Sequence, residues 1–255
     1  MGGGGFGEVY RKQLDNRTFC AVKCIKISHK TEAEINSINQ YLTKEIVSMS
    51  NLLNHKNVIK LIGFLPGQII MEFAMGGDLS KVIYGNKSLP QKAKIHFIKG
   101  IANGLSYIHS QNIVHGDLKS SNVLLDRPYN PLIEELPIPK IADFGLSGEI
   151  DGKIMGYTPR FTAPEIINKF VKVRDFKSDI FSFGMVMYEI IEQHKPFYNI
   201  KNDKMVNMII GEGELFKIEG DKWTPELKNI CLKCLNFNPI ARPTAKEIVD
   251  LLNNI

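Results

Sequence analysis

The sequence predicts an α+β protein with two lobes, a small β-rich lobe followed by a larger helical one. Short β-rich runs surround one helical segment in the first 70 residues, whereas apolar residues recur at helical spacing after the glycine pair at 76–77. The length of 255 residues allows one large domain or two lobes that share a cleft. With 44% hydrophobic and 23% charged residues, the chain can bury a sizeable core, and disorder is not expected as its main state.

The small lobe is predicted from runs rich in β-branched and aromatic residues. The four expected strands are residues 8–10, 18–23, 58–64 and 68–73. Turns are expected at Asp15-Asn16 and at Pro66-Gly67, and residues 32–53 carry apolar side chains three or four positions apart, as in a helix.

The large lobe is predicted from helical periodicity. Its expected helices are residues 91–110, 177–193, 203–210, 225–236 and 244–253. Thr244 and Glu247 have the spacing of a capping box at the start of the last helix. Four of the twelve prolines fall within 128–139, which predicts a loop insertion there.

Composition argues against several classes of protein. The net charge of +5 is mild and no basic run occurs, so nucleic acid is not an expected partner. No apolar stretch is long enough for a membrane span, and Met1–Gly5 lacks the features of a signal peptide, so we predict a cytoplasmic location. Four cysteines are too few for a disulfide framework, and Cys231 and Cys234 lie in an apolar helical pattern that indicates packing rather than metal binding.

Two patterns in the small lobe suggest phosphate binding. Gly2-x-Gly4-x-x-Gly7-x-Val9 matches a glycine-rich loop whose backbone N–H groups can approach phosphate oxygens, although a flexible tail would explain the glycines alone equally well. A dinucleotide-binding interpretation fails because a strand should precede the glycines and a helix should follow them. Lys23 lies on an expected strand, and Glu45 on the following helix offers it a partner.

Three ordered motifs provide the strongest signal. They are His115-Gly116-Asp117-Leu118-Lys119-Ser120-Ser121-Asn122, Asp143-Phe144-Gly145 and Ala163-Pro164-Glu165. With these, the sequence resembles a eukaryotic protein kinase, and its detailed run resembles the tyrosine kinase-like group of Ser/Thr kinases. The resemblance covers Gly2 to about Leu252. It implies a bilobal protein-kinase-like fold in one domain, residues 1–252, with the N-lobe and hinge at 1–73 and the C-lobe at 74–252.

The resemblance also implies ATP and Mg²⁺ as cofactors and assigns residues to each. Those assigned to ATP are Gly2, Gly4, Gly7, Val9, Ala21, Lys23, Met71 (the gatekeeper), Glu72, Ala74, Leu124 and Asp143. Those assigned to catalysis are Asp117 (the base), Lys119 (the γ-phosphate lysine), Asn122, Lys23 and Glu45. Asn122 and Asp143 would be the metal ligands, and their hard oxygen atoms suit Mg²⁺.

Other matched positions have scaffold roles in this family. Asp179 resembles the residue that braces the catalytic loop, and Glu165 with Arg242 resembles a buried ion pair. The packed column that links the lobes would be Met49, Leu61, His115 and Phe144. Trp223, the only tryptophan, is expected to pack in the core of the large lobe.

The catalytic loop also indicates the substrate. Lys119, two residues after Asp117, is the pattern of Ser/Thr kinases, and residues 158–165 resemble a peptide-docking loop of that type. We therefore expect an ATP-dependent kinase that phosphorylates Ser/Thr hydroxyls of protein substrates in signalling, with dual specificity left open. The alternatives are a pseudokinase scaffold, a small-molecule kinase of the His-Gly-Asp type, which lacks the Ala-Pro-Glu segment, and a pure interaction module.

Two features depart from the family pattern. A kinase has a strand ahead of its glycine-rich loop, but here Met1 directly precedes Gly2, so the first strand is expected to be missing, through truncation or an incomplete small lobe. Gly116 stands where the family usually has an arginine that receives an activation-loop phosphate through charge-assisted hydrogen bonds.

Because Gly116 has no side chain to bind a phosphate, we predict that activity does not require phosphorylation of the loop between Asp143 and Glu165. Turnover measured before and after phosphatase treatment should be unchanged. Loss of turnover on dephosphorylation would rule this prediction out.

Overall fold

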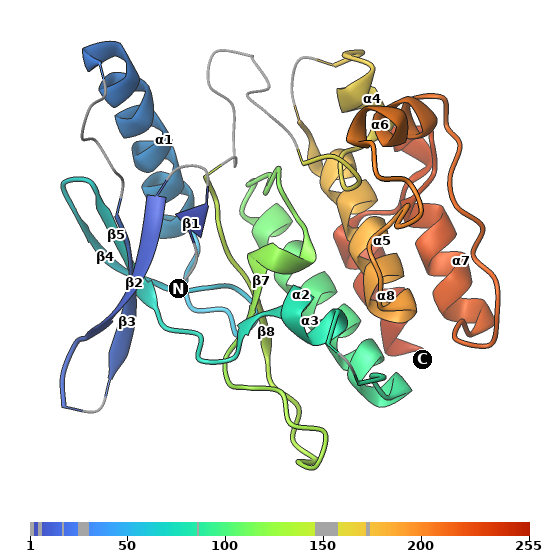
Figure 1. Cartoon of the computed structure of the whole chain (residues 1–255), viewed down its shortest axis with the longest axis horizontal. Helices are drawn as coiled ribbons and strands as arrows, with labels where there is room; N and C mark the ends of the chain where they lie inside the picture. The colour runs from blue at the N-terminus through green and yellow to red at the C-terminus, as the bar shows by residue number, and fades with distance from the viewer. Residues whose placement is uncertain are drawn as a thin grey trace.

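In the computed structural model, a sheet with one long helix forms the N-terminal lobe, and helices form most of the C-terminal lobe (Figure 1). The predicted α+β, bilobal architecture is thereby confirmed. The structure describes residues 3–4, 7–16, 18–24, 31–85, 87–145, 158–171 and 174–255. Within these ranges no helix combines the length and hydropathy needed to cross a membrane.

The described part of the N-terminal lobe contains an antiparallel sheet of five strands in the order β1-β2-β3-β5-β4. The strands are β1 (Gly3–Gly4), β2 (Gly7–Gln13), β3 (Phe19–Cys24), β4 (Leu61–Leu65) and β5 (Gln68–Glu72). Cys20 and Val22 of β3 are buried, while Ala21 and Lys23 lie on the other face of the strand, as the period of two requires. Helix α1 (Glu32–Ser50) follows β3.

The described part of the sheet includes a strand inside the glycine-rich segment. Gly3 pairs with Glu8 and Gly4 with Gly7, so two glycines form a short edge strand against β2. Gly2, which the sequence assigns to the phosphate loop, lies outside the described residues.

Three boundaries in this lobe differ from the prediction by three residues. Strand β2, predicted to end at residue 10, extends to Gln13. Helix α1 ends at Ser50 rather than at residue 53. Leu53 continues the apolar period in the sequence, but it lies beyond the helix and is 77% exposed. The strand expected at 58–64 begins only at Leu61, since Val58 makes no more than an isolated bridge to Ile141.

The C-terminal lobe packs around helices α3 and α5. Its helices are α2 (Leu79–Ile83), α3 (Gln91–Ser110), α4 (Pro164–Ile167), α5 (Phe176–Glu192), α6 (Asp203–Gly211), α7 (Pro225–Cys234) and α8 (Ala245–Asn253). Helix α5 is buried around most of its circumference, which identifies it as the centre of this lobe. The capping box of Thr244 and Glu247 is present at the start of α8.

A second, three-stranded sheet connects the lobes. Its strands, in the order β6-β7-β8, are β6 (Gly77–Asp78), β7 (Val123–Leu125) and β8 (Pro139–Ile141). Ile141 of β8 accepts a hydrogen bond from Ile59 N and donates one to Asn57 O, both at 2.9 Å. The proline-rich residues predicted to be a loop insertion connect β7 to β8 (Figure 1).

The single tryptophan and two of the four cysteines, Cys231 and Cys234, pack in the interior of the C-terminal lobe. Trp223 is buried as predicted and donates to Glu192 Oε1 at 2.6 Å. All four cysteines are free, and Cys231 and Cys234 are fully buried, which raises the pKa of the Cys234 thiol to about 12. Buried thiols of this kind are unreactive packing residues.

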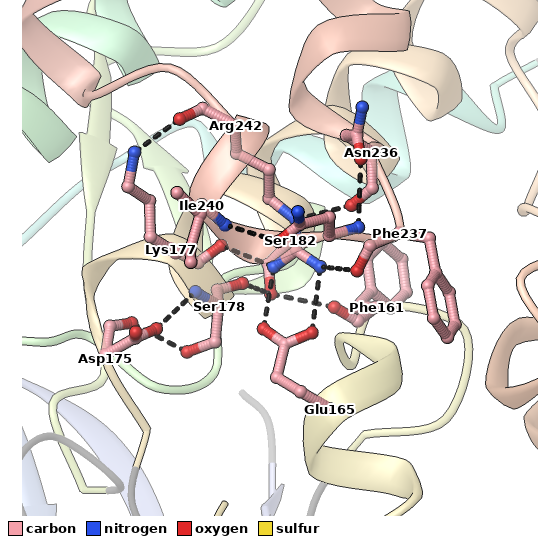
Figure 2. A network of polar contacts seen from close by, with 11 residues as sticks. Phe161, Glu165, Asp175, Lys177, Ser178, Ser182, Asn236, Phe237, Ile240 and Arg242 are labelled. Carbon is pink, nitrogen blue, oxygen red and sulfur yellow. Dashed lines mark hydrogen bonds and ion pairs between the residues drawn. The ribbon is translucent and has the colours of Figure 1, made fainter. Parts of the chain in front are cut away.

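Arg242 and Glu165 form a buried ion pair in the C-terminal lobe (Figure 2). The guanidinium donates to both carboxylate oxygens, at 2.7 and 2.8 Å, and to the carbonyls of Lys177, Asn236 and Phe237. An arginine has five N–H donors, so every one of them has an acceptor here. This network joins the first turn of α5, the loop after α7 and the Ala163-Pro164-Glu165 motif.

We predict that Glu165→Gln destabilises the fold by about 3–5 kcal/mol, because it leaves the buried Arg242 charge uncompensated. Urea unfolding measures the change. The control is Glu134→Gln, which removes the 3.7 Å pair of Glu134 with Lys92, where both side chains are exposed. That loss should stay within about 0.5 kcal/mol, and equal losses in both variants would contradict the prediction.

Candidate active site

Lys23 joins three segments of the chain where the lobes meet. Its Nζ lies 2.8 Å from both carboxylate oxygens of Glu45 on α1 and 2.9 Å from Asp143 Oδ1 in the loop after β8. Glu45 is buried, Lys23 is mostly buried, and the Asp143 side chain is 48% exposed. One ammonium group thus separates two carboxylates that would otherwise repel each other.

The electrostatics of this ion group reflect a balance between burial and charge. Burial alone would lower the pKa of Lys23, but the charges of Asp143 and Glu45 outweigh it and raise that pKa. Burial raises the pKa of Glu45 despite the attraction of Lys23. Burial would also raise the pKa of Asp143, but Lys23 overcomes it and holds that pKa below its usual value.

The Asp143-Phe144-Gly145 segment is held in an uncommon conformation. Asp143 has a φ of +66°, a region that few residues other than glycine adopt. Phe144 is fully buried and packs edge-on against His115, with the ring centroids 5.1 Å apart. Met49 is also buried and Leu61 packs against the same core, so the four residues of the expected column belong to one apolar cluster or its direct neighbours. This packing fixes Asp143 beside Lys23.

Asp117, the predicted base, lies at the centre of a second polar group. Its Oδ2 lies 2.6 Å from Lys119 Nζ, and its Oδ1 accepts a hydrogen bond from the Thr158 hydroxyl, also at 2.6 Å. Lys119 Nζ in turn donates to Thr158 Oγ1 at 3.0 Å. Asn122 Nδ2 donates to the Asp117 carbonyl at 2.8 Å and to Oδ2 at 3.1 Å. Carboxylate, ammonium and hydroxyl therefore form a closed triangle.

The Asp179 carboxylate on α5 binds the backbone of the catalytic loop. It accepts hydrogen bonds from His115 N at 2.7 Å, Gly116 N at 2.8 Å and the His109 ring at 2.9 Å. Burial would raise the pKa of Asp179, but these donors and the nearby histidines lower it. Gly116 has a φ of +79°, which glycine adopts without strain, so the residue that departs from the family pattern suits this backbone.

The residues predicted to surround adenine come from both sheets. Ala21 pairs with Met71, Val9 pairs with Lys23, and Leu124 lies on β7. Gly4 and Gly7 pair with each other where β1 meets β2.

The predicted hinge follows directly after β5. Glu72 N donates to Lys60 O at 2.9 Å, so this residue can offer a nucleotide only its carbonyl group. The Glu72 side chain binds Lys140 Nζ at 3.0 Å, and Ala74 packs against the core.

The two predicted metal ligands have suitable chemistry. Both N–H bonds that Asn122 Nδ2 makes go to Asp117, so the oxygen of the amide is the atom that a cation would contact. Together with a carboxylate oxygen of Asp143, it would form a hard donor set that fits Mg²⁺ with phosphate and water ligands. In the described ranges no group of three or more His, Cys, Asp or Glu side chains could hold a metal. The pair of Asp143 and Asn122 is consistent with that finding, because it contains only one side chain of these four types.

Comparison with known proteins agrees with the fold. The family model described as a protein kinase domain matches residues 1–251. The chain therefore belongs to the protein kinase family. Family membership supports the general use of ATP and a divalent metal.

Three curated relatives illustrate the similarity. The chain is 30% identical to the serine/threonine-protein kinase ATG1b of Arabidopsis thaliana, over 97% of this chain and 34% of the relative. It is 32% identical to a probable serine/threonine-protein kinase of Dictyostelium discoideum, over 99% of this chain and 59% of the relative. It is 33% identical to the PR5-like receptor kinase of Arabidopsis thaliana, over 99% of this chain and 40% of the relative. The chain thus spans about a third to three fifths of these relatives.

Two residues near the catalytic loop are absent from the set of site residues predicted from sequence. Thr158 is recognised in the sequence only as part of the docking loop, because its contact with Asp117 depends on how that loop folds back. Glu189 is the second, and a signal for it exists: it is a lone acidic residue within the apolar run Met187–Ile191 of α5.

The Glu189 carboxyl group is buried beside the catalytic loop. Its side chain is 1% exposed and accepts a hydrogen bond from the Tyr84 hydroxyl after α2. Burial raises the pKa of Glu189 to about 8, although the Lys195 charge and the Ser120 backbone N–H favour the ionised form. Lys195 Nζ lies 5.9 Å from the centre of the Tyr84 ring, so a lysine and a tyrosine are the titratable groups that face it. At neutral pH the carboxyl group is therefore mostly protonated.

We predict that Glu189 makes stability fall as pH rises. The unfolded chain ionises this group near its usual pKa, whereas the folded chain keeps the proton until about pH 8, so unfolding is increasingly favoured between these values. The Glu189→Gln variant cannot ionise at this position. Its free energy of unfolding, relative to that of wild type, should therefore rise by a few kcal/mol, at most about 5, between pH 5 and 8.5.

Urea unfolding at both pH values measures this difference. The control is Glu219→Gln at an exposed loop position, for which the difference from wild type should not change with pH. A constant difference between wild type and Glu189→Gln would contradict the prediction.

Proposed function

We propose that this chain is an active ATP-dependent protein kinase that transfers the γ-phosphate of ATP to Ser or Thr hydroxyls of protein substrates. The observation that carries the proposal is the triangle of Asp117, Lys119 and Thr158 beside the Lys23 ion group. The two groups are close enough for the Lys119 charge to act on Asp143. A hydroxyl acceptor and a phosphate donor would meet between them.

In this proposal Lys23 binds the α- and β-phosphates while Glu45 holds its position. Gly4 and Gly7, with Gly2, provide backbone N–H groups over the phosphates. Val9, Ala21 and Leu124 enclose the adenine ring, Met71 limits the depth of the pocket, and the backbone at Glu72 and Ala74 binds the ring edge. The lobes divide between residues 73 and 74.

Asn122 and Asp143 would hold Mg²⁺ against the phosphates. When bound, Mg²⁺ and ATP supply the transferable phosphoryl group and neutralise part of its charge. The chain itself has mainly to position groups and to compensate charge, because the transition state of phosphoryl transfer is loose.

Asp117 would orient the substrate hydroxyl and accept its proton late in the transfer. The Thr158 hydroxyl and the Lys119 ammonium both contact its carboxylate and keep it aimed at the acceptor. Lys119 would move from Asp117 toward the γ-phosphate as charge develops there. A positioned base of this kind contributes typically 10²–10⁴-fold to rate.

The Ser/Thr preference rests on Lys119 and on the contacts of Thr158, and it agrees with the names of the relatives. Membership of the tyrosine kinase-like group, a role in signalling and a cytoplasmic location are also parts of the proposal. The four free cysteines support a reducing compartment. Protein substrates and the activity of the whole protein are proposals as well, since the relatives are longer.

We expect two substitutions to separate nucleotide binding from turnover. With ATP and Mg²⁺, wild type should show a ligand-dependent rise in melting temperature and should phosphorylate a generic protein substrate. Asp117→Asn should keep the thermal shift and lose at least about 10²-fold in kcat. Lys23→Met should lose both, whereas Lys12→Met, at an exposed position on β2, should lose neither.

The outcome also decides among the alternatives. Wild-type turnover no faster than that of Asp117→Asn would overturn the proposal in favour of a nucleotide-binding pseudokinase. The absence of any thermal shift with ATP and Mg²⁺ would favour a pure interaction module.

A further inference from the structure

Arg160 lies in the docking loop and uses its whole guanidinium group within the protein. Nε donates to Asp203 Oδ1 at 3.0 Å, Nη1 to the carbonyls of Pro196 and Phe197 at 2.8 and 2.7 Å, and Nη2 to Ile200 O at 2.6 Å. Nη2 also forms an ion pair with Asp203 Oδ1 at 2.9 Å. All three nitrogens of the guanidinium therefore have acceptors within the protein, through four hydrogen bonds and the ion pair. Only 13% of the side chain is exposed.

The acceptors come from one segment, the connection between α5 and α6. Three are backbone carbonyls in the turn at 196–200, and the fourth group is the carboxylate of Asp203 at the start of α6. Arg160 and Phe197 have φ values of +75° and +55°, a strained region for residues with side chains. Such conformations persist only where surrounding contacts hold them, and here the guanidinium does so on both sides.

The turn that contains Arg160 also carries Thr158. The Thr158 carbonyl accepts hydrogen bonds from Phe161 N at 3.3 Å and from the Thr162 hydroxyl at 2.9 Å. The Phe161 carbonyl accepts one from the Ser182 hydroxyl of α5 at 2.7 Å, a contact visible in Figure 2. Arg160 therefore fixes the middle of a short turn whose first side chain touches Asp117.

We propose that Arg160 is a positioning residue for phosphoryl transfer, which ties the docking loop to the α5–α6 connection and thereby holds the Thr158 hydroxyl against Asp117 and Lys119. This inference rests on the proposed kinase function for its kinetic consequences. It differs from a role in recognising substrate charge, because all three guanidinium nitrogens bind acceptors within the protein and the charge is already paired with Asp203.

Lysine is the informative replacement for Arg160. Lysine keeps the positive charge and can pair with Asp203. However, its single ammonium group cannot bind three carbonyls and a carboxylate at the same time, as the planar guanidinium does. Thr158→Val removes only the hydroxyl and nearly preserves the shape of the side chain. If Arg160 acts through Thr158, the two variants remove the same effect.

The kinetic test is a double-mutant cycle in kcat with Arg160→Lys, Thr158→Val and the double variant. We expect each single variant to lose roughly 10-fold or more in kcat, the double variant to lose no more than Thr158→Val alone, and the KM for ATP to stay unchanged. Arg127→Lys is the control, because Arg127 makes comparable contacts to Asp126, Glu135 and Leu136 in the loop before β8. It should match wild type in kcat.

Multiplied losses in the double variant, or a wild-type kcat for Arg160→Lys, would overturn the proposal. If Arg160→Lys fails to fold, Asp203→Asn serves instead, since it removes the charge and keeps the carbonyls. It should lose kcat in the same cycle, by a smaller factor.

Amide hydrogen exchange tests the inference independently of turnover. In Arg160→Lys, exchange should be faster both at 158–162 and in the catalytic loop at 115–122, whereas Arg127→Lys should match wild type. Faster exchange confined to 158–162 would overturn the coupling to Asp117. If the protein shows no turnover, the proposed function is refuted, but the hydrogen-exchange result still decides whether Arg160 is coupled to the catalytic loop.

Discussion

The site depends first on the Lys23 ammonium group between Glu45 and Asp143. These residues come from β3, α1 and the loop after β8, so one cation links the sheet, its helix and the C-terminal lobe. Without Lys23, the Glu45 carboxylate would be buried beside another negative charge, which is costly. The register of β3 against β5 places Lys23, and the packing of Phe144 on His115 places Asp143. Those apolar contacts provide the rigidity, and the ion group provides the chemistry.

The C-terminal lobe applies a second constraint, in which polar groups buried in the helical core orient the loops above them. The Asp179 carboxylate accepts hydrogen bonds from the backbone of the catalytic loop. Arg242 and Arg160 bind backbone carbonyls and a carboxylate through all three guanidinium nitrogens. Fully satisfied buried networks are stable, whereas the loss of one partner is costly, so they specify a single loop conformation. The catalytic side chains are thus positioned mainly by hydrogen bonds between these buried charged side chains and the backbone of the loops.

Much of this arrangement could be predicted from the sequence. The predicted helix at 91–110 is confirmed as Gln91–Ser110, because its apolar period is also its buried face, and the fold class follows from the order of strands and helices. Motif spacing was sufficient to nominate Asp117, Lys23 and Asp143. The triangle through Thr158 could not be predicted, since it depends on how the docking loop folds back onto Asp117. The contacts of Arg160 could not be predicted either, since they depend on backbone carbonyls brought together by turns with positive φ. The buried Glu189 had a sequence signal, but its protonation depends on burial that only the fold defines.

In the proposed mechanism the two polar groups cooperate to move a phosphoryl group onto a hydroxyl. The most direct measurement is a rapid-quench single turnover with γ-labelled ATP, Mg²⁺ and a peptide that contains serine and threonine, with the labelled residue identified by mass spectrometry. We expect the label to appear on a serine or threonine side chain with wild type, while with Asp117→Asn it stays in bound ATP. Equal transfer by both proteins, or label found only in free phosphate, would contradict the proposed mechanism.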